Sequence, residues 1–221
     1  MAKKKKAQVT EPTREELSEF AYQPTGAEGL DEGKPFGSQS YKHMKGLLMQ
    51  RVSPSRYVHS ISVAKTARKL ARVYGYDGHI ARMAGLLHDW DKALLPAQLQ
   101  QRISDFDLKV SPDVPTAAAV LRRDFPCFGE EVFRAIERHT VGAPDMAPLD
   151  MIVFVADKIE PTHDVAEYKR LYKQIGTMSL EELFYAVLKE GMSYLVRAGK
   201  PISYDSVTVW NCYNGAKPQE Q

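Results

Sequence analysis

Three observations predict that the chain is an all-α protein, a helical bundle. From about residue 39 onward, apolar residues recur at the spacing of one helix face, and no segment alternates apolar and polar residues as a half-buried strand does. Several of these segments begin with a residue that favours a helix start and end at a glycine. With 43% hydrophobic residues, the 221-residue chain can bury the core of one domain.

The clearest predicted helix begins with Ser53 as its cap and Pro54 in its first turn, and Gly75 follows its end. Serine accepts a backbone hydrogen bond at a helix start, and proline lacks only an N–H that would have no partner there. Asp77 can cap the next helix in the same way, and we expect that helix to end near His88.

A second clear signal is the capping box of Ser179 and Glu182, in which each side chain can accept from the other residue's backbone N–H. We expect Gly199 to end this helix. The other expected helices share a periodic apolar pattern and lie at 41–52, 96–103, 116–125, 130–139, 148–160 and 206–213.

Composition divides the chain into a tail at 1–38, a single domain at 39–215 and a short C-terminal tail at 216–221. The first segment is rich in Lys, Glu, Pro, Gly and Ser and shows little periodicity, so we expect it to be flexible or loosely ordered.

Charge and hydropathy exclude several classes of partner. Four of the 30 basic residues are Lys3–Lys6, which leaves 26 basic residues against 28 acidic ones. We therefore expect no nucleic-acid partner for the folded part. No apolar run approaches the ~20 residues that span a bilayer, so no membrane association is expected.

Cys127 and Cys212 form no disulfide framework or zinc signature, which fits a reducing cytoplasm. A homodimer formed through apolar helix faces is compatible with the sequence.

Polar residues occupy positions where core residues are expected. His59, His139 and Asp157 each lie on the apolar face of a different predicted helix, and His88 and Asp89 close the apolar run of another. A single such histidine is explained by a hydrogen bond in the core, and an Asp–Arg pair would satisfy a buried aspartate. Taken together, the imidazoles and carboxylates favour a divalent metal such as iron, manganese, cobalt or zinc.

The ordered pattern of these residues resembles that of the HD superfamily of metal-dependent phosphohydrolases. Within it, the chain is most similar to the YqeK branch, the symmetrical diadenosine tetraphosphate hydrolases. The resemblance covers about residues 41–215 and rests on "RYVHSISVAKTARKLARVYGYD", "ARMAGLLHDWDK", "AIERHTVG", "LDMIVFVADKIEP" and "WNCYN".

This resemblance implies an all-α HD fold with one or two metal ions, iron or alternatively manganese or cobalt, and a nucleotide or dinucleoside polyphosphate substrate. Four residues would hold the first metal: His59, His88, Asp89 and Asp157. Asp89 would bridge to a second metal bound by His139. Asp89 and Lys92 would be the catalytic residues, with Lys92 contacting a substrate phosphate. The reaction would split diadenosine tetraphosphate into two ADP.

Two acidic residues depart from the family pattern. Asp113 stands where the family has a histidine that helps bind the second metal, and it is either a substitute ligand or a residue at a helix start. Asp91, within "HDWDK", would either repel phosphate or face solvent. If Asp113 does not bind, the alternative is a divergent HD module that binds metal and nucleotide with little turnover. Another nucleotide phosphoester substrate is a further alternative.

Four residues are candidate contacts for the substrate: Lys92, Arg56, Thr140 and His163. Arg56 would alternatively form a salt bridge at the start of its helix. His163 replaces a family arginine, carries only partial charge near neutral pH, and would alternatively be a surface loop residue.

Overall fold

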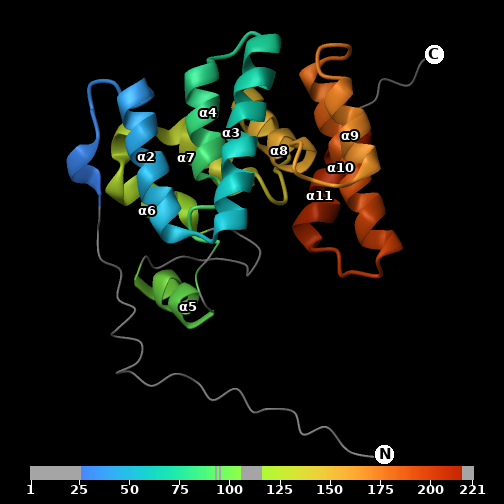
Figure 1. Ribbon diagram of the computed structural model, residues 1–221. Helices are drawn as coiled ribbons and strands as arrows, with labels where there is room; N and C mark the ends of the chain where they lie inside the picture. The colour runs from blue at the N-terminus through green and yellow to red at the C-terminus, as the bar shows by residue number, and fades with distance from the viewer. Residues whose placement is uncertain (1–25, 93, 95, 106–115, 216–221) are drawn as a thin grey trace, which may run out of the picture.

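The computed structural model describes residues 26–92, 94, 96–105 and 116–215 (Figure 1). All of its regular elements within these ranges are helices, so the predicted all-α class is confirmed. No helix in the described ranges is long and apolar enough to cross a membrane. The helices are η1 (Ala27–Gly29), α2 (Ser38–Arg51), α3 (Pro54–Val73), α4 (Gly78–Leu87), α5 (Pro96–Asp105), α6 (Ala117–Asp124), η2 (Pro126–Phe128), α7 (Glu130–Arg138), α8 (Pro148–Ile159), α9 (Ala166–Lys173), α10 (Leu180–Arg197) and α11 (Tyr204–Gly215).

The predicted caps form where they were expected. Ser53 Oγ accepts from a backbone N–H of the first turn of α3 at 3.3 Å, and Asp77 Oδ1 accepts from the start of α4 at 2.6 Å. The Ser179–Glu182 capping box is complete, with hydrogen bonds of 3.1 and 2.8 Å. These contacts satisfy backbone donors that lack partners at a helix start, so they fix where α3, α4 and α10 begin.

Helix α9 is absent from the helices expected from the sequence. Its backbone cap residue, Val165, offers no side-chain acceptor, and Leu171 is its one buried residue. An exposed helix with so narrow an apolar face produces little periodic signal, because it is held by its neighbours rather than by its own pattern. Both α8 and α10 contact α9.

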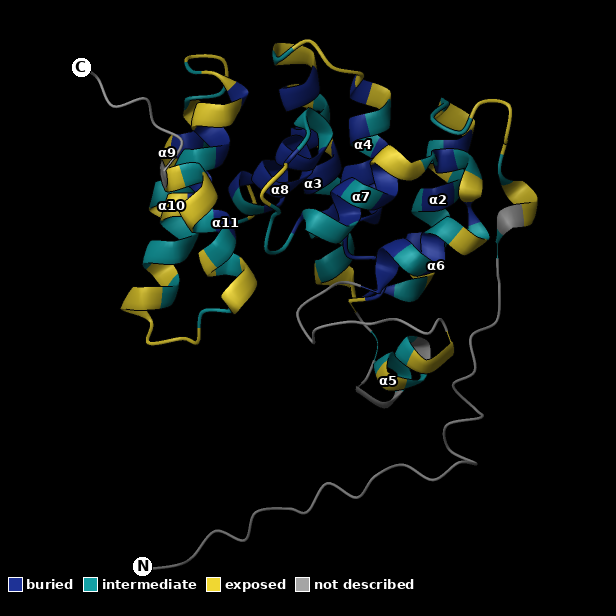
Figure 2. Cartoon of the chain, turned by 180° about the vertical axis from the view of Figure 1, so that it is seen from behind, coloured by how far each residue is buried: buried dark blue, intermediate teal, exposed yellow. Residues whose placement is uncertain are grey.

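The bundle is organised around α3, α4, α7 and α8, with α2 and α6 on one side and α9, α10 and α11 on the other (Figures 1 and 2). Its core has two hydrophobic clusters. Helices α3 and α8 contribute to both, through Ala64 and Val153 to the first cluster and Val63 and Ile152 to the second. The two clusters therefore meet along these helices.

Part of the segment expected to be a loose tail packs against the bundle. Leu30 and Phe36 lie against the first cluster, and the Phe36 and Phe128 rings have centroids 5.9 Å apart. The His43 ring is hydrogen-bonded through Nε2 to the Gly26 carbonyl at 2.6 Å. Isolated apolar residues in a Pro- and Gly-rich segment give no periodicity, so this packing has no signature in the sequence.

Helices α3 and α4 approach each other closely at Gly85. A Cβ atom added to Gly85 would lie 3.1 Å from Ala64 Cα and 3.2 Å from the Val63 carbonyl oxygen. Both are backbone atoms of α3, so they cannot move without shifting the helix. Gly85 is therefore required by the close packing of α4 on α3.

We expect Gly85→Ala to lower the free energy of unfolding by about 1–2 kcal/mol, because overpacking costs more than alanine gains in helix propensity. The matched control is Gly46→Ala in α2, where an added Cβ meets nothing within 4 Å. That control should raise the free energy of unfolding by about 0.5–1 kcal/mol. Urea denaturation of both variants measures the difference, and a Gly85→Ala protein as stable as the wild type would contradict the packing argument.

Candidate metal centre

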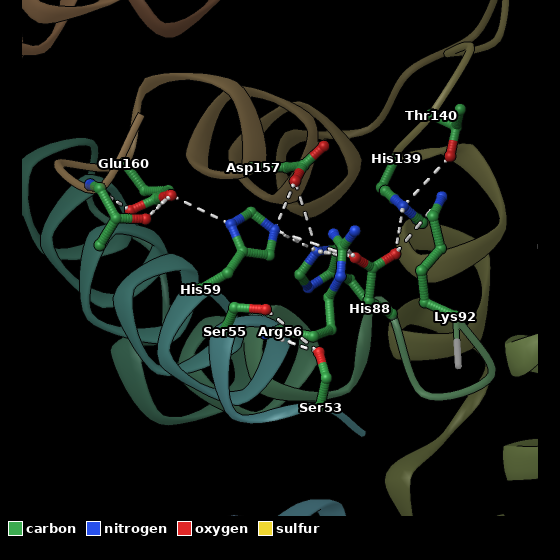
Figure 3. A network of polar contacts seen from close by, with 12 residues as sticks. Ser53, Ser55, Arg56, His59, His88, Lys92, His139, Thr140, Asp157 and Glu160 are labelled. Carbon is green, nitrogen blue, oxygen red and sulfur yellow. Dashed lines mark hydrogen bonds and ion pairs between the residues drawn. The ribbon is translucent and has the colours of Figure 1, made fainter. Parts of the chain in front are cut away.

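The predicted ligand side chains come from four helices and converge at one point (Figure 3). His59 lies on α3 and Asp157 on α8, while His139 directly follows the last residue of α7. His88 and Asp89 directly follow α4. His88, Asp89 and His139 are buried, with His88 only 1% exposed. The close packing of α4 on α3 thus brings His88 and Asp89 to His59.

Three ligand atoms are spaced as they would be around one cation, and a carboxylate oxygen of Asp89 lies beside them. His59 Nε2, His88 Nε2 and Asp157 Oδ1 lie 3.1, 3.2 and 3.3 Å from one another. Asp89 Oδ2 lies 3.4 Å from His88 Nε2 and 3.9 Å from His59 Nε2. Nitrogen and oxygen ligands at about 2.0–2.2 Å from one metal are separated by roughly 3.0–3.6 Å. The donor set therefore fits a divalent cation that prefers imidazole and carboxylate ligands.

Each histidine ring is held through its other nitrogen. His88 Nδ1 donates to the Gly85 carbonyl at 2.8 Å, and His139 Nδ1 donates to the carbonyl three residues before it at 2.7 Å. His59 Nδ1 donates to Glu160 Oε1 at 3.0 Å. With Nδ1 donating in this way, it is Nε2 that faces the centre, and histidine ligates protein-bound metals through a nitrogen placed like this once that nitrogen is unprotonated.

Glu160 is a site residue that the sequence did not single out. It is 1% exposed and also accepts from the Thr162 N–H at 2.7 Å. Burial opposes ionisation, but hydrogen bonds from His59, Ser62 and Thr162 lower the pKa of Glu160 to about 2. Glu160 is therefore an ionised acceptor that orients His59. The signal that could have found it is an acidic residue about one helical turn beyond Asp157 in "ADKIEP".

The two oxygens of Asp89 face different partners. Oδ2 faces His59 and His88, whereas Oδ1 lies 3.7 Å from His139 Nε2 and 3.9 Å from Lys92 Nζ. One carboxylate thus separates the cluster of His59, His88 and Asp157 from His139. This is the arrangement that a bridging carboxylate between two cations requires.

Burial and charge set the protonation of these groups. Burial disfavours the charged form of His88, but the Asp89 charge and hydrogen bonds to Asp157 and Asp89 outweigh it and raise the pKa of His88 to about 10. The pKa of Asp89 is lowered despite burial, chiefly by the charge of His88 and a hydrogen bond to His139. Burial lowers the pKa of His139, so this ring is neutral at neutral pH and ready to act as a ligand.

Cationic side chains surround the carboxylates. Arg56 Nη1 lies 2.6 Å from Asp89 Oδ2, so the salt bridge anticipated for Arg56 forms with a predicted metal ligand. Lys158 Nζ pairs with Asp157 Oδ2. Lys92 is exposed, and its ammonium group is free to turn toward an anion beside Asp89. The result is a positive rim around a negative centre.

The other predicted substrate contacts border the same centre. Thr140 Oγ1 lies 3.1 Å from His139 Nε2. The His163 ring meets the His59 ring edge to face with centroids 5.5 Å apart, and His163 Nε2 lies 3.7 Å from Glu160 Oε1. His163 is therefore a partly buried neighbour of the centre rather than a detached surface residue.

Asp91 differs from both expectations. It does not face solvent, because it is 8% exposed, accepts from Thr116 Oγ1 at 2.9 Å and lies 3.6 Å from Arg51 Nη2. The Arg51 guanidinium also lies over the Trp90 ring, 4.5 Å from its centroid. The carboxylate is thus taken up by partners of the core and does not point at a phosphate. Asp113 lies outside the described residues.

We expect His88→Ala and Asp157→Ala to abolish metal binding, because each removes one of the three closely spaced ligand atoms. Glu160→Gln should instead weaken metal affinity about 10- to 100-fold, as is usual for a residue that orients a ligand. Metal content after dialysis against a chelator and reloading with manganese measures these effects. His79→Ala, an exposed histidine of α4, is the control and should retain full stoichiometry. Full stoichiometry in either alanine variant of the cluster would refute the ligand set.

Metal affinity should rise with pH. His88 has a raised pKa of about 10, so between pH 6.5 and 8.5 it is protonated in the metal-free protein and must lose a proton to bind. Affinity should therefore increase up to about tenfold per pH unit, with roughly one proton released per metal. Titration calorimetry in two buffers of different ionisation enthalpy counts the protons. An affinity that does not change over this range would contradict the assignment.

Comparison with known proteins places this geometry in a family. Residues 56–162 match the model of the HD domain. The symmetrical bis(5'-nucleosyl)-tetraphosphatase of Halalkalibacterium halodurans is 30% identical, in a match that covers 76% of this chain and 95% of that protein. The Staphylococcus aureus protein of the same name is 27% identical over 77% of this chain and 92% of its own length.

A solved structure agrees with these matches. The crystal structure of an HD superfamily hydrolase from Clostridium acetobutylicum, described as involved in NAD metabolism, superposes with a TM-score of 0.73 at 25% identity. The match covers 82% of this chain and all of that one. The chain therefore belongs to the HD superfamily of metal-dependent phosphohydrolases, in the YqeK-like branch that includes the symmetrical bis(5'-nucleosyl)-tetraphosphatases.

Proposed function

We propose that this HD phosphohydrolase cleaves diadenosine tetraphosphate symmetrically into two molecules of ADP. The observation that carries the proposal is the Asp89 carboxylate, whose two oxygens face two separate groups of ligand atoms. The names of the relatives from Halalkalibacterium halodurans and Staphylococcus aureus support the choice of substrate.

The first cation would be held by the Nε2 atoms of His59 and His88 and by carboxylate oxygens of Asp89 and Asp157, and a second by Asp89 and His139. Asp113 would join the second set as a carboxylate in place of a histidine. Divalent cations held in this way would polarise a phosphoryl oxygen. They would also lower the pKa of a bound water toward neutrality, so that hydroxide is available. Iron is our first choice of metal, and manganese or cobalt suit the same nitrogen and oxygen donors.

The cationic rim is suited to hold the polyphosphate. Lys92 reaches the Oδ1 side of Asp89, and Arg56 reaches its Oδ2 side. When a metal binds the Asp89 carboxylate, phosphate oxygens could therefore replace that carboxylate as the partner of Lys92 and of Arg56. His163, beside His59, would contact a neighbouring phosphate. Positioned cations of this kind offset the charge that develops on a phosphoryl group during transfer.

The bond change is a hydrolysis of the central phosphoanhydride. Water adds its oxygen to one inner phosphorus, and the bond from that phosphorus to the bridging oxygen breaks. The two products are ADP, and the two hydrogens of the water end on their new terminal phosphates, which release up to two protons to solvent as the pH rises through neutrality. Asp89, with its lowered pKa, stays ionised throughout and serves as a ligand and not as a proton carrier.

We expect the full chain, purified without oxygen and loaded with iron(II), manganese or cobalt, to convert diadenosine tetraphosphate into ADP alone. Anion-exchange chromatography separates ADP from AMP and ATP. A mixture of AMP and ATP would contradict symmetrical cleavage. Bound metal without nucleotide release would favour a binding module instead.

The variant Asp113→His serves as the matched comparison for the second cation. If it restores activity to a chain that binds metal without turnover, the aspartate is the cause of the loss. If a panel of other nucleotides is cleaved while diadenosine tetraphosphate is not, the hydrolase has a different phosphoester substrate.

A further inference from the structure

A cavity of about 590 Å³ opens beside the candidate metal centre. Three of its lining residues each contact a predicted ligand: Thr140 contacts His139, Lys158 pairs with Asp157, and His163 lies against His59. Figure 3 shows Thr140 next to His139 at the edge of the ligand cluster. One end of the cavity therefore borders the metal centre.

The rest of the lining has a different chemistry. It comes from α8, α9, α10 and the start of α11, and most of it is apolar. The apolar residues and aromatic rings on which a ligand could pack include Phe154, Val187, Leu188, Met192, Tyr168 and Tyr194. This size and this mixture of apolar walls with a few polar groups are typical of small-molecule sites, which measure about 300–1,000 Å³.

The charged residues of the cavity lie in two groups. Lys158 and His163 belong to the metal-centre end. The other two, Glu190 and Arg197, pair with each other at 2.6 Å. Because this pair neutralises itself, the cavity body offers no free cation to a polyphosphate among its described residues. Phosphates are better accommodated at the metal-centre end, where Arg56, Lys92 and Lys158 gather.

We propose that this cavity binds one nucleoside of the substrate, with its base among the apolar residues of α8 and α10 and its phosphates directed past Lys158 and His163 to the metal centre. The inference rests on the proposed function for the presence of a nucleoside, and it deepens that function by locating one end of the substrate. A base is flat and largely apolar on its faces, which suits walls made of aromatic and aliphatic side chains.

Gly191 offers a way to fill the cavity without disturbing the ligand set. It lines the cavity from within α10, and an added Cβ would lie in ordinary contact with Tyr168 Oη at 3.9 Å. A leucine there would extend beyond this point into the cavity. The hydroxyl of Tyr168 remains protonated as a donor over the physiological range, because burial raises the pKa of Tyr168 to about 12.

The test measures binding to the full, manganese-loaded chain by titration calorimetry. Gly191→Leu should weaken ADP binding at least tenfold and change the binding of inorganic tripolyphosphate less than twofold. Gly46→Leu, the same substitution in α2 away from this cavity, should change neither. Unchanged ADP binding in Gly191→Leu would overturn the proposal, and so would equal weakening of ADP and tripolyphosphate.

A second measurement needs no variant and covers the case in which Gly191→Leu does not fold. Photolabelling of the wild-type chain with 8-azido-ADP should modify residues of α8 to α11, identified by peptide mass spectrometry. Labelling confined to α2–α7, or no ADP binding at all, would overturn the nucleoside site. Neither measurement depends on turnover, so a chain that binds ADP in this cavity but does not cleave diadenosine tetraphosphate would refute the proposed function alone.

Discussion

Two carboxylates buried at the same point impose the main constraint on this structure. Asp89 and Asp157 both approach His88, and burying two negative charges together is costly unless cations and hydrogen bonds compensate. In the metal-free chain, Arg56, Lys158 and the His88 proton provide that compensation. A divalent cation held by the proposed ligands would do the same with one charged group, and its binding would release these partners for other anions. The same two carboxylates can thus be neutralised either by the cationic side chains of the rim or by a metal.

The helix packing fixes the positions of the imidazole rings relative to the carboxylates. Gly85 brings α4 against α3 with no side chain between them, and its carbonyl accepts from the His88 ring three residues later. The same residue therefore sets both the distance between two helices and the orientation of one imidazole. His139 is held in the same way at the end of α7, so these two rings rest on backbone carbonyls, whereas His59 rests on the buried carboxylate of Glu160.

The helix starts and the burial of polar site residues could largely be predicted from the sequence, for identifiable physical reasons. Ser53, Asp77 and the Ser179–Glu182 box are local signals, and the helices that they start are present. A polar residue at an apolar-face position of a helix is predicted to be buried. His59 Nε2 and Asp157 Oδ1, from two such positions, do lie 3.1 Å apart. Asp91 was misjudged because its partners Arg51 and Thr116 are distant in sequence. Glu160 was overlooked for a similar reason, since its role depends on an acceptor reaching His59, 101 residues away.

That separation has a consequence for how the protein is made. The ligand cluster joins α3 to α8, and the contact between His59 and Glu160 closes a loop of 101 residues. During synthesis from the N-terminus, the first half of the bundle emerges with His59, His88 and Asp89 but without Asp157. If the proposed ligand set holds a metal, the nascent chain would present an incomplete site until α8 has left the ribosome and docked. The order of helices along the chain thus places completion of the proposed site late in synthesis.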